Sequence, residues 1–234
     1  MTRPLRIALI AVIVAALAFV GGPWIYINVF RDDAPAPLAD TTTPVDSGVD
    51  TSVADTIPAL PSDVSGTWTV TAESVAGYRV EEILFGQNVT AVGRTNAVTG
   101  SFTFEGESLT SASFDVDMAT IESDDSRRDR QFASRIMDVA TYPTATFVLG
   151  APIILPDGAL TGTPVTIDAT GDLTMRGTTR TVTITLNASL TTEGIDVRGE
   201  YEVVFAEWNI PDPSLPGIST EDRGILEFRL LATR

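Results

Sequence analysis

Residues 181–190 read Thr-Val-Thr-Ile-Thr-Leu-Asn-Ala-Ser-Leu, the clearest alternation of polar and apolar residues in the chain. Apolar side chains occupy every second position, which is the pattern of a β-strand with one face buried and the other in solvent. The same alternation recurs in six further stretches, at residues 98–104, 114–118, 145–149, 169–175, 201–205 and 226–230. Strands are also expected near Trp68 and Tyr78, which brings the expected count to eight or nine.

Turn signals separate these stretches, among them Pro156-Asp157-Gly158 and Thr192-Glu193-Gly194. So many alternating strands in roughly 170 residues, with little helix to cover a second sheet face, predict an all-β antiparallel barrel or sandwich. Residues 124–139 break the pattern, because their apolar residues recur at helical spacing. One helix is therefore expected against the barrel, with a capping box at residues 126–129.

The composition excludes several kinds of site. The chain of 234 residues contains no histidine and no cysteine, and all 15 of its basic residues are arginine. Imidazole, thiolate and lysine amine are the usual bases, nucleophiles and soft metal ligands near pH 7. Their absence rules out Ser-His-Asp and Cys-His enzymes, histidine zinc sites and Walker lysines. Carboxylate chemistry remains, as a glycosidase-type pair or a hard-metal site.

Residues 7–30 read IALIAVIVAALAFVGGPWIYINVF and carry no charge. As a helix this segment would be about 36 Å long against a hydrocarbon core of about 30 Å, so it is expected to cross a membrane. Arg3 and Arg6 precede it, which by the positive-inside rule places the N-terminus in the cytoplasm. A cleaved signal peptide ending near residues 16–18 (Ala-Leu-Ala) is the competing interpretation. Both interpretations place the remainder of the chain outside the cytoplasm.

Residues 32–63 contain seven Asp, five Pro and no basic residue. Such a segment buries too little apolar surface to offset its ordering entropy, and its like charges repel, so a disordered linker is predicted. The expected organisation is a single-pass transmembrane anchor at residues 1–31, the linker at 32–63, and a barrel domain at 64–234.

The net charge of −16 is also unevenly placed, because residues 64–234 carry 12 Arg against 24 acids. A domain of this sign is a poor binder of nucleic acid, and none is expected as a partner. The sequence leaves open whether the domain forms a homodimer.

Three ordered motifs carry a resemblance to a known family. They are residues 122–134 with their Arg-Asp helix start, residues 137–147 with Tyr-Pro before Thr-Ala-Thr-Phe, and residues 171–182 with Gly-Asp-Leu-Thr-Met-Arg-Gly-Thr-Thr. Together with Gly66-Thr67-Trp68 they resemble the YceI-like, polyisoprenoid-binding domain family over roughly the whole of residues 65–234. The resemblance implies a lipocalin-like eight-stranded antiparallel barrel, which agrees with the strand count.

The resemblance also implies that the hydrophobic lumen holds an isoprenoid chain, such as the tail of a quinone or polyprenol. No cofactor is expected beyond such a lipid. Each buried methylene of such a tail contributes about 0.8 kcal/mol, so binding requires almost no polar contact. The same inward side chains would serve equally to fill a closed core, and the pattern does not separate lining from filling. The candidate lumen residues are Phe102, Phe104, Phe114, Val116, Phe147, Leu149, Ile184, Leu186, Val203, Phe205, Phe228 and Leu230.

Arg127 and Arg128, at the start of the predicted helix, are the candidates for contact with a ligand headgroup at the barrel mouth. Acids are interleaved with them, so a self-compensated surface helix is the plainer interpretation. Many members of the family carry one histidine beside the opening Ser and another after the Arg-Asp pair. Glu73 and Gln131 stand at those positions here, so any headgroup or metal site built on those histidines would be absent.

The sequence therefore predicts a membrane-tethered, extracytoplasmic protein that binds an isoprenoid lipid without catalysis and reaches the membrane through residues 7–30. The first alternative is a non-catalytic cell-surface interaction module with a solid β core. The second is a carboxylate-dependent hydrolase built on residues 105 and 107 or 115 and 117, all acids. Such an enzyme needs two carboxylates about 5 to 9.5 Å apart in a cleft, whereas these acids are expected to face solvent.

Overall fold

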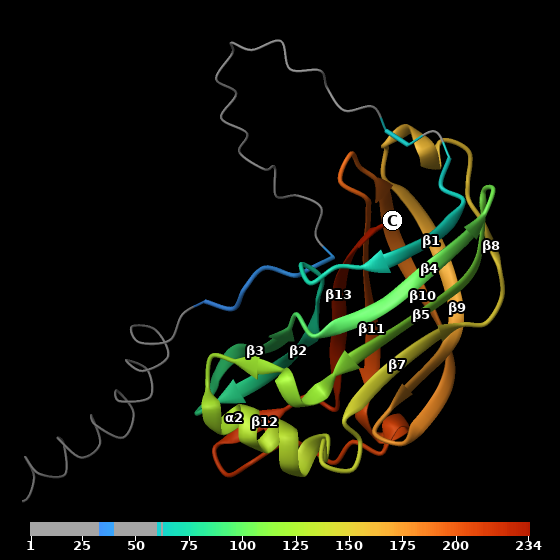
Figure 1. Cartoon of the computed structure of the whole chain (residues 1–234). Helices are drawn as coiled ribbons and strands as arrows, with labels where there is room; N and C mark the ends of the chain where they lie inside the picture. The colour runs from blue at the N-terminus through green and yellow to red at the C-terminus, as the bar shows by residue number, and fades with distance from the viewer. Residues whose placement is uncertain (1–32, 40–59, 62) are drawn as a thin grey trace, which may run out of the picture.

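The computed structural model describes residues 33–39, 60, 61 and 63–234 (Figure 1). The expected anchor at residues 7–30 and most of the expected linker lie outside the described residues. Within the described part, no helix is long and apolar enough to cross a membrane.

Thirteen strands form a single sheet, and short helical segments connect some of them. The helical segments are η2 (Met118–Thr120), α2 (Ser126–Gln131), the π-helical turn η3 (Phe132–Ile136), η4 (Ala159–Thr161) and η5 (Phe205–Trp208). The strands are β1 (Gly66–Val70), β2 (Val75–Leu84), β3 (Gln87–Thr95), β4 (Val98–Glu105), β5 (Ser108–Asp117), β6 (Glu122–Ser123), β7 (Thr144–Leu149), β8 (Ile153–Ile154), β9 (Val165–Met175), β10 (Thr178–Leu190), β11 (Ile195–Val204), β12 (Ile218–Thr220) and β13 (Arg223–Thr233).

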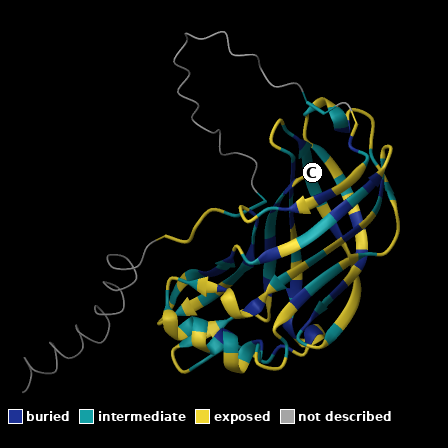
Figure 2. Ribbon diagram, in the orientation of Figure 1, coloured by how far each residue is buried: buried dark blue, intermediate teal, exposed yellow. Residues whose placement is uncertain are grey.

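Eight antiparallel strands close a circuit in the order β1-β4-β5-β7-β9-β10-β11-β13, and β13 pairs back with β1. The prediction of an eight-stranded antiparallel barrel with one helix is therefore confirmed. The alternating residues 181–190 make up most of β10. Its outward threonines Thr181 and Thr185 donate hydrogen bonds to Asp172 and Asp168 of β9, at 2.7 and 2.8 Å, while Ile184 between them is buried. Figure 2 shows the resulting alternation of buried and exposed residues along the strands.

One edge of β13 pairs with β11 along its length, and the other edge is shared by two strands. Its last residues pair with β1, whereas Ile225 to Arg229 pair with β2, which extends the sheet through β3 to β6. Ser74 sits at the fork and is fully buried. Its hydroxyl accepts a hydrogen bond from the Leu231 amide at 3.0 Å and lies 3.3 Å from the Leu231 carbonyl, to which it donates. The barrel is thus closed tightly at the β1 end and widened at the other by β2 and β3.

The closed end is filled by a large apolar side chain. Trp68 of β1 is 3% exposed, and its indole N–H donates to the Val64 carbonyl at 2.7 Å. The Arg234 guanidinium lies over the indole, 4.9 Å from the ring centroid. Phe104 and Leu109 belong to the same buried cluster, so this end of the barrel is a packed core.

The wide end carries α2 and the π-helical turn η3 (Figure 1). The expected capping box at residues 126–129 is wrong. Asp125 is the N-cap, and its carboxylate accepts from the Arg127 amide at 2.7 Å. Asp129 instead accepts from the Ser123 amide and hydroxyl, at 2.9 and 2.6 Å, because the preceding strand β6 lies within its reach.

Replacement of Trp68 by alanine is expected to lower the free energy of unfolding by about 3–5 kcal/mol, because it leaves a cavity and removes the indole hydrogen bond. Ile154→Ala is the control, since Ile154 is 74% exposed, and a change within about 0.5 kcal/mol is expected there. Chemical denaturation of the two variants checks this. Equal losses would contradict the packed closed end.

Candidate functional site

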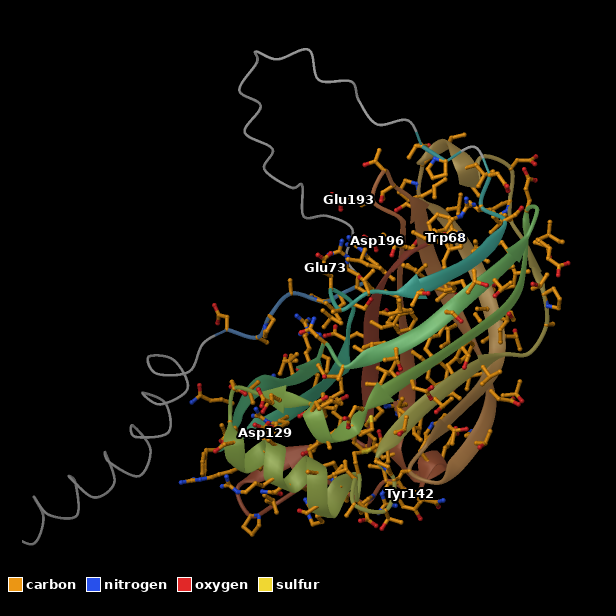
Figure 3. The ribbon with its side chains drawn as sticks, in the orientation of Figure 1. Trp68, Glu73, Asp129, Tyr142, Glu193 and Asp196 are labelled. Atoms are coloured by element: carbon orange, nitrogen blue, oxygen red, sulfur yellow. The ribbon has the colours of Figure 1, made fainter. Side chains whose placement is uncertain are left out.

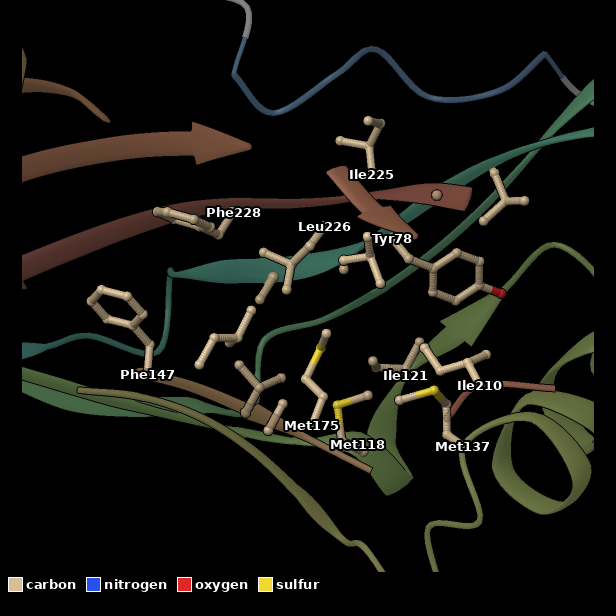
Figure 4. A pocket seen from close by; sticks show the side chains of 18 of the residues that line it. Tyr78, Met118, Ile121, Met137, Phe147, Met175, Ile210, Ile225, Leu226 and Phe228 are labelled. Carbon is tan, nitrogen blue, oxygen red and sulfur yellow. The ribbon is translucent and has the colours of Figure 1, made fainter. Parts of the chain in front are cut away.

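A cavity of about 200 Å³ occupies the interior of the barrel (Figure 4). It extends from Phe102 and Leu230, near the closed end, to Arg128 and Thr220 at the wide end. Nearly all of the lining side chains are apolar, so the space has few partners for water and suits an apolar ligand.

Most of the candidate lumen residues lie in the wall of this cavity. Phe104 lies instead in the wall of a second cavity of about 40 Å³ at the closed end, and Leu149 packs against the core cluster around Trp68. The ligand contacts of all twelve candidates stay a prediction. The candidates that line the main cavity are Phe102, Phe114, Val116, Phe147, Ile184, Leu186, Val203, Phe205, Phe228 and Leu230.

Aromatic rings in the wall lie over glycines of the neighbouring strands. Phe228 pairs with Gly199 across β13 and β11, and a Cβ atom on Gly199 would come within 2.7 Å of the Phe228 ring. Phe114 has the same relation to Gly100, at 2.8 Å. A side chain at either glycine would push the ring away from the wall. The small residues therefore keep the rings against the sheet and leave the lumen open.

The three methionines of the described residues, Met118, Met137 and Met175, all line the cavity. Methionine is unbranched, with three rotatable bonds and a polarizable sulfur, so it adapts to differently shaped apolar ligands. An engineered cavity of about 150 Å³ holds one benzene. A ligand longer than a short prenyl chain therefore requires these flexible side chains to move or the tail to extend through the mouth.

The two headgroup candidates are placed differently. Arg128 lines the wide end of the cavity, whereas Arg127 is exposed and lies outside the lining. The Arg128 guanidinium pairs with Asp124 and lies 3.7 Å from the Glu82 carboxylate. Burial by itself would lower the pKa of Arg128, but these two acids outweigh it and raise the pKa. Arg128 is thus a fixed cation at the cavity mouth.

Tyr78 stands beside Arg128 and was not among the candidates. Its ring stacks on Phe132, with centroids 5.1 Å apart and planes at 12°. Burial, the largest cause, raises the pKa of the Tyr78 phenol, so the group stays protonated and able to donate a hydrogen bond. Figure 4 shows its hydroxyl at one end of the apolar lining. A sequence signal existed, because Tyr78 is a lone aromatic at an inward position of an expected strand.

The acids do not form a catalytic pair in this cavity. Glu82 is the one carboxylate among its described lining residues. The pairs at residues 105 and 107 and at 115 and 117 face solvent, as expected. Neither Glu73 nor Gln131 lines the cavity, and the described residues contain no cluster of three or more acids placed to hold a metal ion.

Comparison with known proteins agrees with this architecture. The YceI-like domain matches residues 68–232. The chain belongs to the YceI-like domain family. No curated protein matches the sequence.

Two solved structures share the fold over the full barrel. BcnA of Burkholderia cenocepacia is 24% identical, with a TM-score of 0.54, and the match covers 70% of this chain and 99% of BcnA. A polyisoprenoid binding domain from Saccharophagus degradans, implicated in plant cell wall breakdown, is 14% identical, with a TM-score of 0.57, and the match covers 72% of this chain and 98% of that domain. The match over residues 68–232 confirms, at the level of the family, the resemblance seen in the three sequence motifs.

Gly199→Val is expected to reduce the cavity by displacing Phe228 into it. The free energy of unfolding should fall by about 1–3 kcal/mol, because the added methyl groups overpack the wall. Glu200→Val, on the outward face of the same strand, is the control. Uptake of a fluorescent apolar probe, measured beside thermal unfolding, checks this. Unchanged uptake by the Gly199 variant would contradict the role of the glycine.

Proposed function

We propose that this protein binds an isoprenoid lipid of the quinone or polyprenol type in the lumen of its barrel. The observation that carries the proposal is an apolar cavity of about 200 Å³ whose polar groups gather at one end. The fold shared with a polyisoprenoid binding domain supports it. A solid-core interaction module would not contain such a cavity.

The tail would be held by burial alone. Each methylene removed from water contributes about 0.8 kcal/mol, and the aromatic and methionine side chains of the wall supply the contact surface. The methionines allow tails of differing length, since their side chains can take other rotamers without polar groups being exposed.

The headgroup would lie at the wide end, between Arg128 and Tyr78. The Arg128 guanidinium only donates hydrogen bonds, whereas the protonated Tyr78 hydroxyl donates one and can also accept. Asp124 and Glu82 already balance the charge of Arg128. A neutral acceptor, such as a quinone carbonyl, therefore fits this mouth better than a phosphate does, because it brings no further negative charge to an acidic domain.

The expected anchor at residues 7–30 would place the barrel outside the cytoplasm and beside the membrane that holds such lipids. A tether raises the effective concentration of the barrel near its ligand. The proposed protein is thus a single-pass, membrane-anchored lipid carrier or store.

Ala169→Trp is expected to abolish lipid binding. Ala169 lines the cavity and is 3% exposed, so the indole would occupy the ligand space. Thr170→Trp is the matched control, because Thr170 is the next residue and faces solvent. Purified proteins would be extracted and the lipids identified by mass spectrometry. Prenyl lipid should accompany the wild type and the Thr170 variant, and its absence from all three would refute the proposal.

Arg128→Gln is expected to weaken binding of a short-chain quinone by roughly ten- to a hundred-fold, the value of a hydrogen bond from a charged group. Arg127→Gln is the control, because Arg127 lies outside the cavity. Titration followed by tryptophan fluorescence measures both. An equal effect of the two substitutions would show that the headgroup does not contact Arg128.

A further inference from the structure

Residues 33–39 lie against the outer wall of the barrel, although they belong to the expected linker (Figure 1, blue). Three hydrogen bonds hold them. Arg79 and Arg94 donate to the carbonyls of Pro35 and Ala36, both at 2.5 Å. The Leu38 amide donates to the Glu227 carboxylate at 3.2 Å.

The wall is shaped to receive this segment. Glu227, Gly77 and Arg94 face one another in a row across β13, β2 and β3. Because Gly77 has no side chain, the Arg94 guanidinium crosses it and donates to Glu227 at 2.7 and 2.9 Å. A Cβ atom on Gly77 would lie 2.1 Å from the Gly93 carbonyl oxygen and 2.9 Å from Arg94 Cγ. The row therefore depends on glycine at this position.

Glu227 is unusual for an outward-facing acid, because it is only 1% exposed. A buried carboxylate is costly unless it is paired and hydrogen-bonded. Arg94 pairs with it, Arg79 Nε lies 3.5 Å away, and the Leu38 amide supplies a further donor. We call Arg79, Arg94 and Glu227 the outer cradle.

The segment Asp33-Ala-Pro-Ala-Pro-Leu-Ala39 suits the outer cradle chemically. Alternating prolines favour the extended polyproline II conformation, which leaves its carbonyls free for external donors. Arg79 and Arg94 donate to two consecutive carbonyls of the segment, and the Glu227 carboxylate accepts from the amide that follows the second proline. Such a rigid segment also loses little conformational entropy on docking.

The segment has a defined direction along the wall. Leu38 contacts Glu227 in the row of Gly77, whereas Pro35 contacts Arg79, two residues nearer the β2–β3 turn. From Leu38 back to Pro35, the segment therefore runs toward the wide end, where the cavity mouth lies. Phe85 and Ile83, at that turn, are 60% and 48% exposed.

We propose that residues 33–39 are a strap that docks in the outer cradle and holds the cavity mouth toward the membrane. The orientation rests on the proposed function, because it takes residues 7–30 as the membrane anchor. With the strap docked, only residues 31 and 32 separate that anchor from the barrel. The lipid-binding end, with its exposed Phe85 and Ile83, then faces the lipid surface.

Docking is tested on the full-length chain by the distance between two spin labels. The sequence has no cysteine, so Ala34→Cys and Glu200→Cys give a unique pair, and both residues are exposed. The wild-type strap should give a narrow distance distribution. Leu38→Pro removes the amide that donates to Glu227 and should broaden the distribution, whereas Leu38→Ala keeps the amide and should leave it narrow. A broad wild-type distribution, or equal effects of the two substitutions, overturns the strap.

Orientation is tested with the full-length chain in phosphatidylcholine vesicles that contain an acceptor-labelled phosphatidylethanolamine. A donor dye is attached at one of two sites. Glu221→Cys places it beside Thr220, which lines the cavity mouth. Glu193→Cys places it at the end of the barrel opposite the helix residue Asp129, as Figure 3 shows. Energy transfer should be stronger from residue 221 than from residue 193, and Leu38→Pro should abolish the difference. Equal transfer in the wild type overturns the orientation.

These measurements use no ligand. A result that contradicts the strap therefore does not bear on lipid binding, and a protein that binds no lipid could still show the docked strap.

Discussion

The interior of the barrel stays open because aromatic rings lie over glycines of the neighbouring strands. Phe228 over Gly199 and Phe114 over Gly100 are the clearest cases. A valine at residue 199 would press the Phe228 ring inward, and one at residue 100 would meet both the Phe114 ring and the Ser113 carbonyl oxygen, so the lumen would narrow. An eight-stranded barrel is just wide enough either to be filled by side chains or to hold one slender ligand. The glycines decide between these outcomes.

The two ends of the cavity differ because one edge of β13 pairs with β1 at its end and with β2 before it. At one end β1 closes the circuit and Trp68 fills it, and at the other β2 and β3 widen the sheet. Ser74 supplies hydrogen bonds to Leu231 where β1 and β2 diverge along that edge of β13. One end is therefore a packed core and the other a mouth. The polar groups of the site, Arg128 and Tyr78, lie at the mouth, where Asp124 and Glu82 balance the charge of Arg128.

The sequence predicted an all-β antiparallel barrel or sandwich, because period-2 alternation is a direct consequence of strands that bury one face. The resemblance to the YceI-like family narrowed this prediction to an eight-stranded barrel. The alternation also predicted most of the cavity wall. It did not separate Phe104, which lies in the closed end, from Phe102 two residues earlier, because both point inward and only their height along the barrel differs. Nor did it separate Arg127 from Arg128, which differ by about 100° around one short helical turn.

The outer cradle was also beyond the sequence pattern. Glu227 stands at an outward position of the alternating strand pattern, and an acid at such a position is expected to face solvent. Its burial comes from Arg94, which reaches it across Gly77, and from residues 33–39, which lie far from it in the chain. Alternation describes which face a side chain takes and carries no information about what covers that face. Two of the five prolines that marked residues 32–63 as a linker, Pro35 and Pro37, also suit residues 33–39 to docking.

The most direct test of the lipid-binding lumen is a crystal structure of the protein grown with farnesol, a short prenyl alcohol. We expect continuous electron density along the barrel axis, with the tail against Phe147 and Phe228, rearranged methionine side chains, and the hydroxyl near Arg128 and Tyr78. A lumen that contains only ordered water, or farnesol bound solely on the outer surface, would contradict lipid binding in the lumen.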